Sequence, residues 1–252
     1  MPIPQPPTET EFQNHPVVDR AAWLEARKAL LAEEKALTRH HDEVCRLRRA
    51  LPWVKVDADY VFEGPEGDIT LGALFRGRSQ LIIYHFMFGP GWKEGCDGCS
   101  FLSDHVDGAR RHFEHHDVAF AAVSRAPLAE FQAFKARMGW TFPWLSSHGS
   151  SFNYDFGVSF TPEQIAAEGT PYNYGTTPYK HEELHGLSVF ARKADGTVFH
   201  TYSAYARGVE ILTGALLFLD LTPRGRNEQG TMDWVRLHDR YEGAEAARCG
   251  CH

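Results

Sequence analysis

Two cysteines three residues apart, Cys96 and Cys99, are the residues of this sequence best suited to chemistry. They lie in the stretch GPGWKEGCDGCSFL, directly after the apolar run LIIYHF. At positions i and i+3 of a first helical turn, two thiols are close enough to form a disulfide with little movement. A bridge across so short a loop removes little entropy from the unfolded chain, so it would be a weak structural staple. The spacing therefore favours redox chemistry, with a metal site and an inert thiol pair as alternatives.

The residues around the pair favour Cys96 as the reactive thiol. Exposed backbone N–H groups and the helix dipole at the start of a helix stabilise a thiolate. We therefore expect Cys96, nearer the loop and water, to attack a disulfide, and Cys99, deeper in the helix, to resolve the mixed disulfide. The carboxylate of Asp97 opposes this because it raises the pKa of Cys96, and Lys93 is expected to counter it.

The elements that must position these thiols follow a β-α-β-α order, with a hairpin before it and a hairpin and helix after it. Consecutive β-α-β units predict parallel strands with right-handed crossovers. We therefore predict an α/β protein with a thioredoxin-like fold, in which helices flank a mixed central sheet. The expected elements are a hairpin with a short helix (60–75), a buried strand (80–88), a helix (101–116), a buried strand (118–124), a helix (127–139), two strands around Asp195-Gly196 and a helix (209–220).

The rest of the chain divides into a proline-rich flexible arm (1–18), an N-terminal helix (19–51), the thioredoxin-like domain (52–222) and a C-terminal extension and tail (223–252). Asp19 is the expected N-cap of the long helix, and Cys45 on it is expected to be a buried, apolar residue. Apolar residues recur on it at seven-residue intervals, which suits either a homodimer seam or a helix lying on the main domain. They are Trp23, Leu30, Leu37, Val44 and Leu51.

The C-terminal extension carries two further groups of candidate residues. In WVRLHDRY, Arg236, His238 and Asp239 are able to order one another and to supply a proton donor to a leaving thiolate, although a solvated helix with local ion pairs fits the same residues. Near the chain end, Cys249 and Cys251 would complete a tetrahedral zinc site with the first cysteine pair. We favour an exposed, oxidisable tail over that site, because a mobile chain end holds metal weakly.

Composition and missing motifs exclude several classes of function. The 252 residues carry a net charge of −7, so no basic field favours nucleic acid as a partner. The chain start does not have the form of a secretory signal, and no apolar stretch is long enough for a membrane span, so a cytoplasmic location is expected. No Gly-rich phosphate loop or serine nucleophile elbow occurs, and no cofactor is expected. An aromatic segment, 170–185, is predicted to be an ordered loop or lid. Binding of a small apolar ligand by this lid is a third hypothesis for the function.

The stretches YHFMFGPGWKEGCDGCSFLSDH, VAFAAVSRAPLAEFQAFKARMGWTFPWLSSHGSSFNYDFGV and WVRLHDRY resemble the DUF899 family of bacterial thioredoxin-like proteins, which are predicted dithiol-disulfide oxidoreductases. The resemblance implies a thioredoxin fold with Cys96 and Cys99 at the reactive position. Trp92 resembles the tryptophan near many thioredoxin active sites. The stretch 182–190, where thioredoxins place a cis-proline, has no proline, which puts substrate docking by that route in doubt.

The stretch 141–158 is similar to the middle of peroxiredoxin-type domains, so a peroxide is an alternative substrate to a disulfide. The expected partners are thus a protein or small-molecule disulfide, or a peroxide, together with an external thiol reductant. The alternative function is a zinc-binding or redox-sensing interaction protein on the same scaffold, without turnover.

Overall fold

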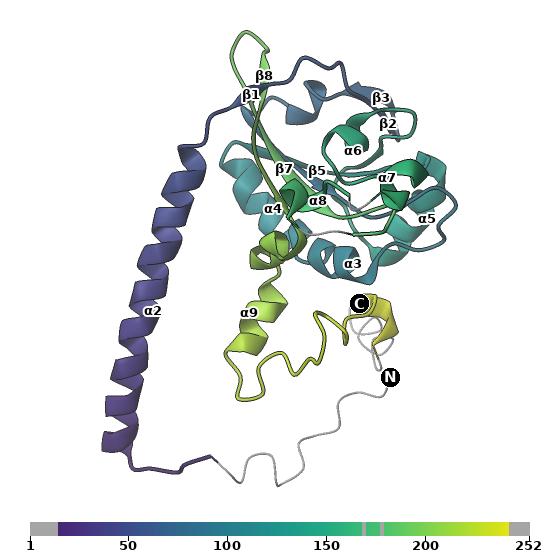
Figure 1. Ribbon diagram of the computed structural model, residues 1–252. Coiled ribbons are helices and arrows are strands. Elements are labelled where there is room, and N and C mark those ends of the chain that lie inside the picture. The colour runs from purple at the N-terminus through teal and green to yellow at the C-terminus, as the bar shows by residue number, and fades with distance from the viewer. Residues whose placement is uncertain (1–14, 168–169, 177–178, 242–252) are drawn as a thin grey trace, which may run out of the picture. The chain divides into compact units, whose positions relative to one another are not determined.

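The computed structural model describes residues 15–167, 170–176 and 179–241, and the chain forms two compact units, 1–52 and 53–252. The described part of the first unit is essentially one helix, α2 (Arg20–Arg49), drawn in purple in Figure 1. Asp19 caps it, since its carboxylate accepts a hydrogen bond of 2.8 Å from the backbone N–H of Ala22. The predicted helix and its cap are therefore confirmed.

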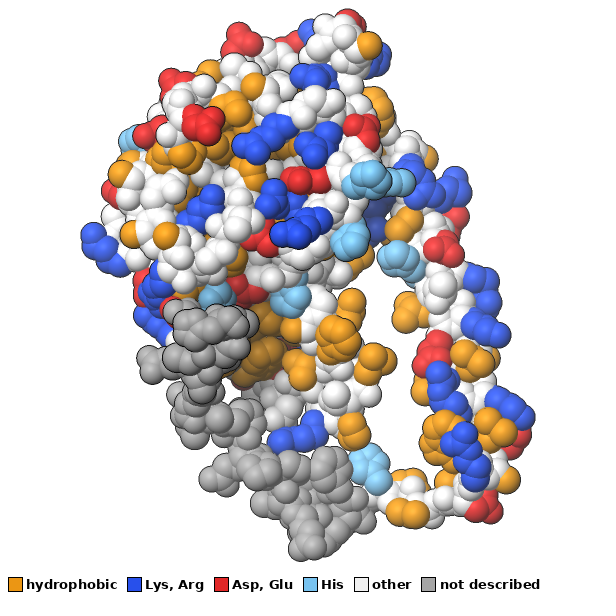
Figure 2. Space-filling model, turned by 180° about the vertical axis from the view of Figure 1, so that it is seen from behind, with side chains coloured by type: hydrophobic (Ala, Val, Ile, Leu, Met, Phe, Trp, Pro, Cys, Tyr) orange, Lys and Arg blue, Asp and Glu red, His pale blue; other side chains and the backbone are white. Residues whose placement is uncertain are grey.

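No residue of α2 is buried. Charged and hydrophobic side chains alternate along the helix in Figure 2, and Trp23 is 45% exposed. Cys45 is only partly buried, so the expectation of a buried, apolar cysteine is wrong. Homodimer formation through this helix remains a prediction.

The second unit is built on an eight-stranded sheet in the order β1-β8-β7-β4-β5-β6-β2-β3. β4, β5 and β6 are parallel, and the pairs β4–β7, β7–β8, β1–β8, β2–β3 and β2–β6 are antiparallel. The strands are β1 (Val54–Lys55), β2 (Val61–Gly64), β3 (Gly67–Thr70), β4 (Gln80–His85), β5 (Val118–Ser124), β6 (Trp144–Ser146), β7 (Gly186–Arg192) and β8 (Val198–Tyr205).

The connections between these strands follow the thioredoxin order (Figure 1). From β4 the chain passes through α3 (Asp97–Ser103) and α4 (Val106–His115) to β5, and then through α5 (Leu128–Met138) to β6. The antiparallel pair β7 and β8 follows, and η2 (Ala206–Leu212) and α9 (Gly214–Asp220) come after it. A mixed sheet with two parallel crossovers, an antiparallel hairpin and a closing helix is a thioredoxin-like fold, so the predicted fold class is confirmed.

Both faces of the central strands are buried, which explains their continuous apolar sequences. Successive side chains of a strand point to opposite faces. In β4, Leu81 and Ile83 face one core and Tyr84 the other. The first core contains the hairpin β2–β3, the short η1 (Ala73–Phe75) and Phe152 of α6 (Phe152–Asp155); the second packs α3, α4 and α5 around Trp144.

Two predicted helices are broken in the structure. The helix expected over 101–116 is divided into α3 and α4, because the His105 ring bonds the carbonyl of Phe101 at 2.7 Å and accepts the N–H of Ala215 at 3.1 Å. The helix expected over 209–220 is divided at Thr213, which has non-helical backbone angles of φ −103° and ψ 85°. At His105, a contact between distant parts of the folded unit overrides the helical pattern.

The remaining short elements are α7 (Pro162–Ala166), α8 (Tyr172–Gly175) and η3 (His238–Arg240). Tyr172, in the aromatic segment, is buried and packs against Tyr179 and Tyr205. Hydrophobic side chains gather on the surface over α9 (Figure 2), where Phe218 is 75% exposed. No helix in the described parts of the chain combines the length and the hydropathy needed to cross a bilayer.

Candidate active site

The two cysteines lie just beyond the carboxyl end of β4, in the centre of the sheet. Cys96 is the N-cap residue of α3 and is partly exposed, whereas Cys99 is 1% exposed. The backbone N–H of Cys96 donates to the carbonyl of Met87 at 3.4 Å. A Cβ atom at Gly95 would lie 2.5 Å from Cε1 of Phe86, so only glycine fits before Cys96. Local packing thus fixes the start of the helix at this residue.

The pKa of Cys96 is lowered to about 7. The main cause is a hydrogen bond with the Cys99 side chain, and the backbone N–H groups of Cys99 and Gly98 add to it. Burial and the charge of Asp97 act in the opposite direction. Hydrogen bonds to a thiolate favour the charged form, so Cys96 is the thiol that ionises near neutral pH.

Cys99 shows the opposite behaviour, because burial first, and then the hydrogen bond and charge of Cys96, raise its pKa well above the ordinary value. Two donors act against this rise. The hydroxyl of Tyr84 bonds the Cys99 sulfur, and the backbone N–H of Met87 points at the same sulfur at 3.5 Å. The site therefore holds one thiol prone to ionise and one that keeps its proton.

Tyr84 is a residue of this site that the sequence analysis did not single out. It lies on β4, is fully buried, and burial followed by the charge of Cys99 raises its pKa. The only sequence signal is a single hydroxyl within the apolar strand LIIYHF. Cys99 also raises the pKa of Tyr172, after the larger effect of burial, so a second phenol lies near the sulfurs.

The other residues expected near the pair occupy different positions. Trp92 is half-buried and packs beside Phe88, with ring centroids 6.4 Å apart. Asp97 is exposed in the first turn of α3. Lys93 is exposed and forms no hydrogen bond or ion pair within the described chain. The effect of Asp97 on the pKa of Cys96 is thus offset by hydrogen bonds.

The C-terminal extension reaches this site, but its candidate residues bond to other elements. His238 Nδ1 lies 2.7 Å from Oδ1 of Asp104, between α3 and α4. Asp239 pairs with Arg137 of α5 at 2.7 Å, and the Arg236 guanidinium donates to the carbonyls of residues 233 and 235. The proton-donor role of His238 remains a prediction.

A cluster around Glu94, two residues before Cys96, holds the C-terminal extension to the loop between β4 and α3. Its carboxylate accepts hydrogen bonds from Arg137 and, at 2.6 and 2.7 Å, from Arg240. Met232 also lies close, since a Cβ atom at Gly98 would be 3.8 Å from the Met232 sulfur and 3.9 Å from that of Cys96. Met232 therefore lies near the partly exposed thiol, and Arg240 is bonded to Glu94, two residues before it.

The described residues contain no cis peptide bond, and His185 directly precedes β7, where thioredoxins place their cis-proline. Within the same residues, no group of three or more His, Cys, Asp or Glu side chains is arranged to hold a metal ion. Cys249 and Cys251 lie outside the described residues.

The solved structures that resemble this chain include the following three. Peroxidoxin BcpB from Mycobacterium tuberculosis is 14% identical, with a TM-score of 0.44, over 66% of this chain and 92% of that one. Peroxiredoxin Q from Xanthomonas campestris is 15% identical, with a TM-score of 0.44, over 67% and 95%. A putative protein disulfide isomerase from Bacteroides thetaiotaomicron is 14% identical, with a TM-score of 0.38, over 71% and 94%.

No curated protein matches this chain. The profile of the family described as "Bacterial protein of unknown function (DUF899)" matches residues 12–241, which include the whole described site. The match extends well beyond the cysteine stretch and spans most of the sequence. The chain therefore belongs to the DUF899 family of bacterial proteins, as the resemblance of its sequence motifs predicts.

Proposed function

We propose that this protein is a thiol-disulfide oxidoreductase in which Cys96 is the attacking thiolate and Cys99 the resolving thiol. The observation that carries the proposal is the opposite pKa shift of two neighbouring thiols. The pKa of Cys96 falls to about 7, while that of Cys99 rises well above its ordinary value. Such a pair has one sulfur suited to attack and another suited to resolution. An inert pair does not need two thiols with such different pKa values.

In the first step the Cys96 thiolate attacks one sulfur of a substrate disulfide. A bond forms between the two sulfurs, the substrate S–S bond breaks, and its electron pair leaves with the second substrate sulfur as a thiolate, which takes a proton from water. Cys96 is partly exposed at the N-cap of α3, so a substrate sulfur reaches it from solvent.

In the second step Cys99 attacks the Cys96 sulfur of the mixed disulfide. Formation of that disulfide removes the charge of Cys96, which is one cause of the raised pKa of Cys99. The Tyr84 hydroxyl and the Met87 N–H then stabilise the Cys99 thiolate. The remaining substrate sulfur leaves, so the substrate gains two electrons and a Cys96–Cys99 disulfide forms. An external thiol reductant restores the dithiol, in keeping with a cytoplasmic protein.

A peroxide is the second substrate class for the same thiolate. Attack of Cys96 on the O–O bond would give a sulfenic acid and release water or an alcohol. Cys99 would then condense with the sulfenic acid to form the same disulfide and release water. Both substrates therefore converge on one oxidised form of the protein.

Turnover assays with single cysteine variants test the proposal. We expect Cys96→Ser to abolish reduction of insulin disulfides in the presence of dithiothreitol. Cys99→Ser, incubated with a disulfide substrate without dithiothreitol, should stop at a mixed disulfide visible in the intact mass. Hydrogen peroxide consumption, measured in parallel, tells whether peroxides are substrates. Cys45→Ser, on α2, is the matched control and should retain wild-type rates. Wild-type rates in Cys96→Ser would refute the proposal.

A further inference from the structure

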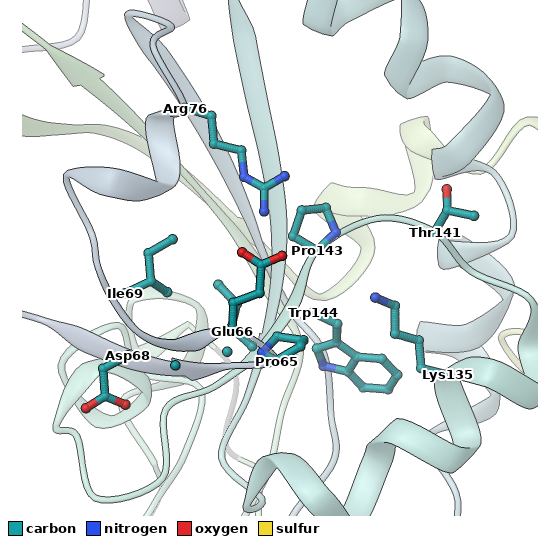
Figure 3. Close-up of a pocket in the computed structure, with 12 residues that line it drawn as sticks. Pro65, Glu66, Asp68, Ile69, Arg76, Lys135, Thr141, Pro143 and Trp144 are labelled. Atoms are coloured by element: carbon teal, nitrogen blue, oxygen red, sulfur yellow. The ribbon is translucent and has the colours of Figure 1, made fainter.

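A cavity of about 380 Å³ opens beside the edge of the sheet (Figure 3). It lies between the hairpin β2–β3, the end of η1, α5 and the start of β6, and none of its lining residues belongs to the cysteine site. Its volume falls within the range of small-molecule sites. Ile69, Pro143 and Leu145 supply apolar parts of its wall.

Three charged side chains from three different elements point into this cavity. Figure 3 shows the Arg76 guanidinium, the Glu66 carboxylate and the Lys135 ammonium directed toward its centre, whereas Asp68 points away. Arg76 is the C-cap residue of η1, Glu66 lies in the turn between β2 and β3, and Lys135 is on α5. Two positive groups and one negative group thus converge in one concave space.

The two cations are not neutralised within the described part of the chain. Neither Arg76 nor Lys135 forms an ion pair there, whereas the nearby Arg110 is held by Asp107 and Glu114 at 3.2 Å each. Burial is the main cause that lowers the pKa of Lys135. The charge of Asp107 acts against it, and the smaller effects of Arg110 and Arg76 lower the pKa further. An anion placed between the two cations would relieve their repulsion.

The backbone does not require an arginine at position 76. Arg76 has φ 49° and ψ 44°, in the left-handed region that favours glycine, and Gly77 follows with φ 82°. A glycine would adopt these backbone angles at a lower conformational cost. The arginine therefore carries a conformational cost at this position, which suits a side chain that binds a ligand.

We propose that this cavity binds a small amino acid or a similar zwitterion, with its carboxylate between Arg76 and Lys135 and its ammonium group on Glu66. Guanidinium and ammonium groups form charge-assisted hydrogen bonds with a carboxylate, and the Glu66 carboxylate accepts from an amine. Glu66 also disfavours an all-anionic ligand, since it adds a negative charge to the site. The proposal is independent of the thiol chemistry.

Calorimetric titration with two probes tests both the carboxylate site and the ammonium site of the proposal. Glutamate and glutarate share a carbon chain and two carboxylates, and only glutamate has the amine. We expect saturable binding of glutamate in the micromolar to millimolar range and at least ten-fold weaker binding of glutarate. Arg76→Gly and Lys135→Gln should each weaken glutamate binding at least ten-fold, and Glu66→Gln should abolish the preference for glutamate.

Control measurements separate binding from folding. Arg111→Gln, an exposed cation on α4 outside the cavity, should bind glutamate like the wild type. Arg76→Gly should also have an unchanged or higher midpoint of thermal unfolding, because glycine suits its backbone angles. Absence of saturable binding of glutamate at millimolar concentration, wild-type affinity in Arg76→Gly, or equal affinity for the two probes would each overturn the proposal.

Discussion

The hydroxyl of Tyr84 bonds the sulfur of Cys99 within the core. This contact joins the central strand β4 to the first turns of α3, and it lowers the pKa of a thiol that burial and Cys96 raise. The Tyr84 phenol is thus the side chain best placed to stabilise Cys99 as a thiolate at the moment of resolution.

Replacing Tyr84 with phenylalanine should therefore slow the second step and leave the first unchanged. A hydrogen bond of about 1 kcal/mol corresponds to a roughly five-fold slower release of the mixed disulfide. Rapid-quench mass spectrometry of the mixed disulfide measures this rate. Tyr60→Phe is the matched control, since the Tyr60 hydroxyl bonds Asp155 at 2.8 Å in the other core. Equal resolution rates in Tyr84→Phe and wild type would show that the contact has no part in resolution.

The sequence predicts the sheet well where burial alone decides the structure. The strand 118–124 is found with the predicted bounds, because a strand buried on both faces has a continuous apolar sequence. Cys96 begins its helix as expected, since a Gly-rich loop precedes it. Asp19 caps α2 for the equally local reason that its side chain bonds an N–H three residues on.

The partners of the site residues could not be predicted, because they are distant in the sequence. Glu94 bonds Arg137 and Arg240, which are 43 and 146 residues away. His105 breaks a helix through a contact with residue 215, 110 residues away. Nothing in a local pattern indicates such pairs. The sequence suggested a role for residues 236–239 beside a leaving thiolate, but not the bonds of the extension to Asp104 and Glu94.

The pH dependence of Cys96 alkylation follows from the pKa of about 7. Because only the thiolate reacts, the rate with iodoacetamide should rise with pH, reach half its maximum near pH 7 and then level off. Cys99→Ala removes the largest stabilising hydrogen bond and should move the midpoint up, whereas Asp97→Asn removes an opposing charge and should move it down. The measurement needs a background in which Cys45, Cys249 and Cys251 are serine. Shifts of the same sign in both variants would contradict this account.

Glu94→Gln should loosen the C-terminal extension. It weakens the ion pairs with Arg137 and Arg240, and half-exposed pairs of this kind contribute about 0.5–1 kcal/mol each. We expect faster amide hydrogen exchange in residues 232–241 and faster alkylation of Cys96, because Met232 of this segment lies near its sulfur. Glu43→Gln, which breaks an exposed pair with Arg46 on α2, should change neither. Unchanged exchange in Glu94→Gln would mean that the other contacts of the extension, among them His238 with Asp104 and Asp239 with Arg137, hold it without Glu94.

Gly95→Ala and Gly98→Ala provide a matched test of how tightly the loop is packed before and after Cys96. A Cβ atom at Gly95 would meet Phe86 at 2.5 Å and Phe134 at 2.9 Å, whereas one at Gly98 has no neighbour closer than 3.8 Å. Overpacking at Gly95 should lower the free energy of unfolding by about 1–3 kcal/mol and raise the pKa of Cys96 as its hydrogen bonds lengthen. Alanine at Gly98 should be neutral or stabilising, because it favours helix. Urea unfolding and iodoacetamide titration measure the two effects, and equal losses in both variants would show that the close contacts at Gly95 do not position the thiol.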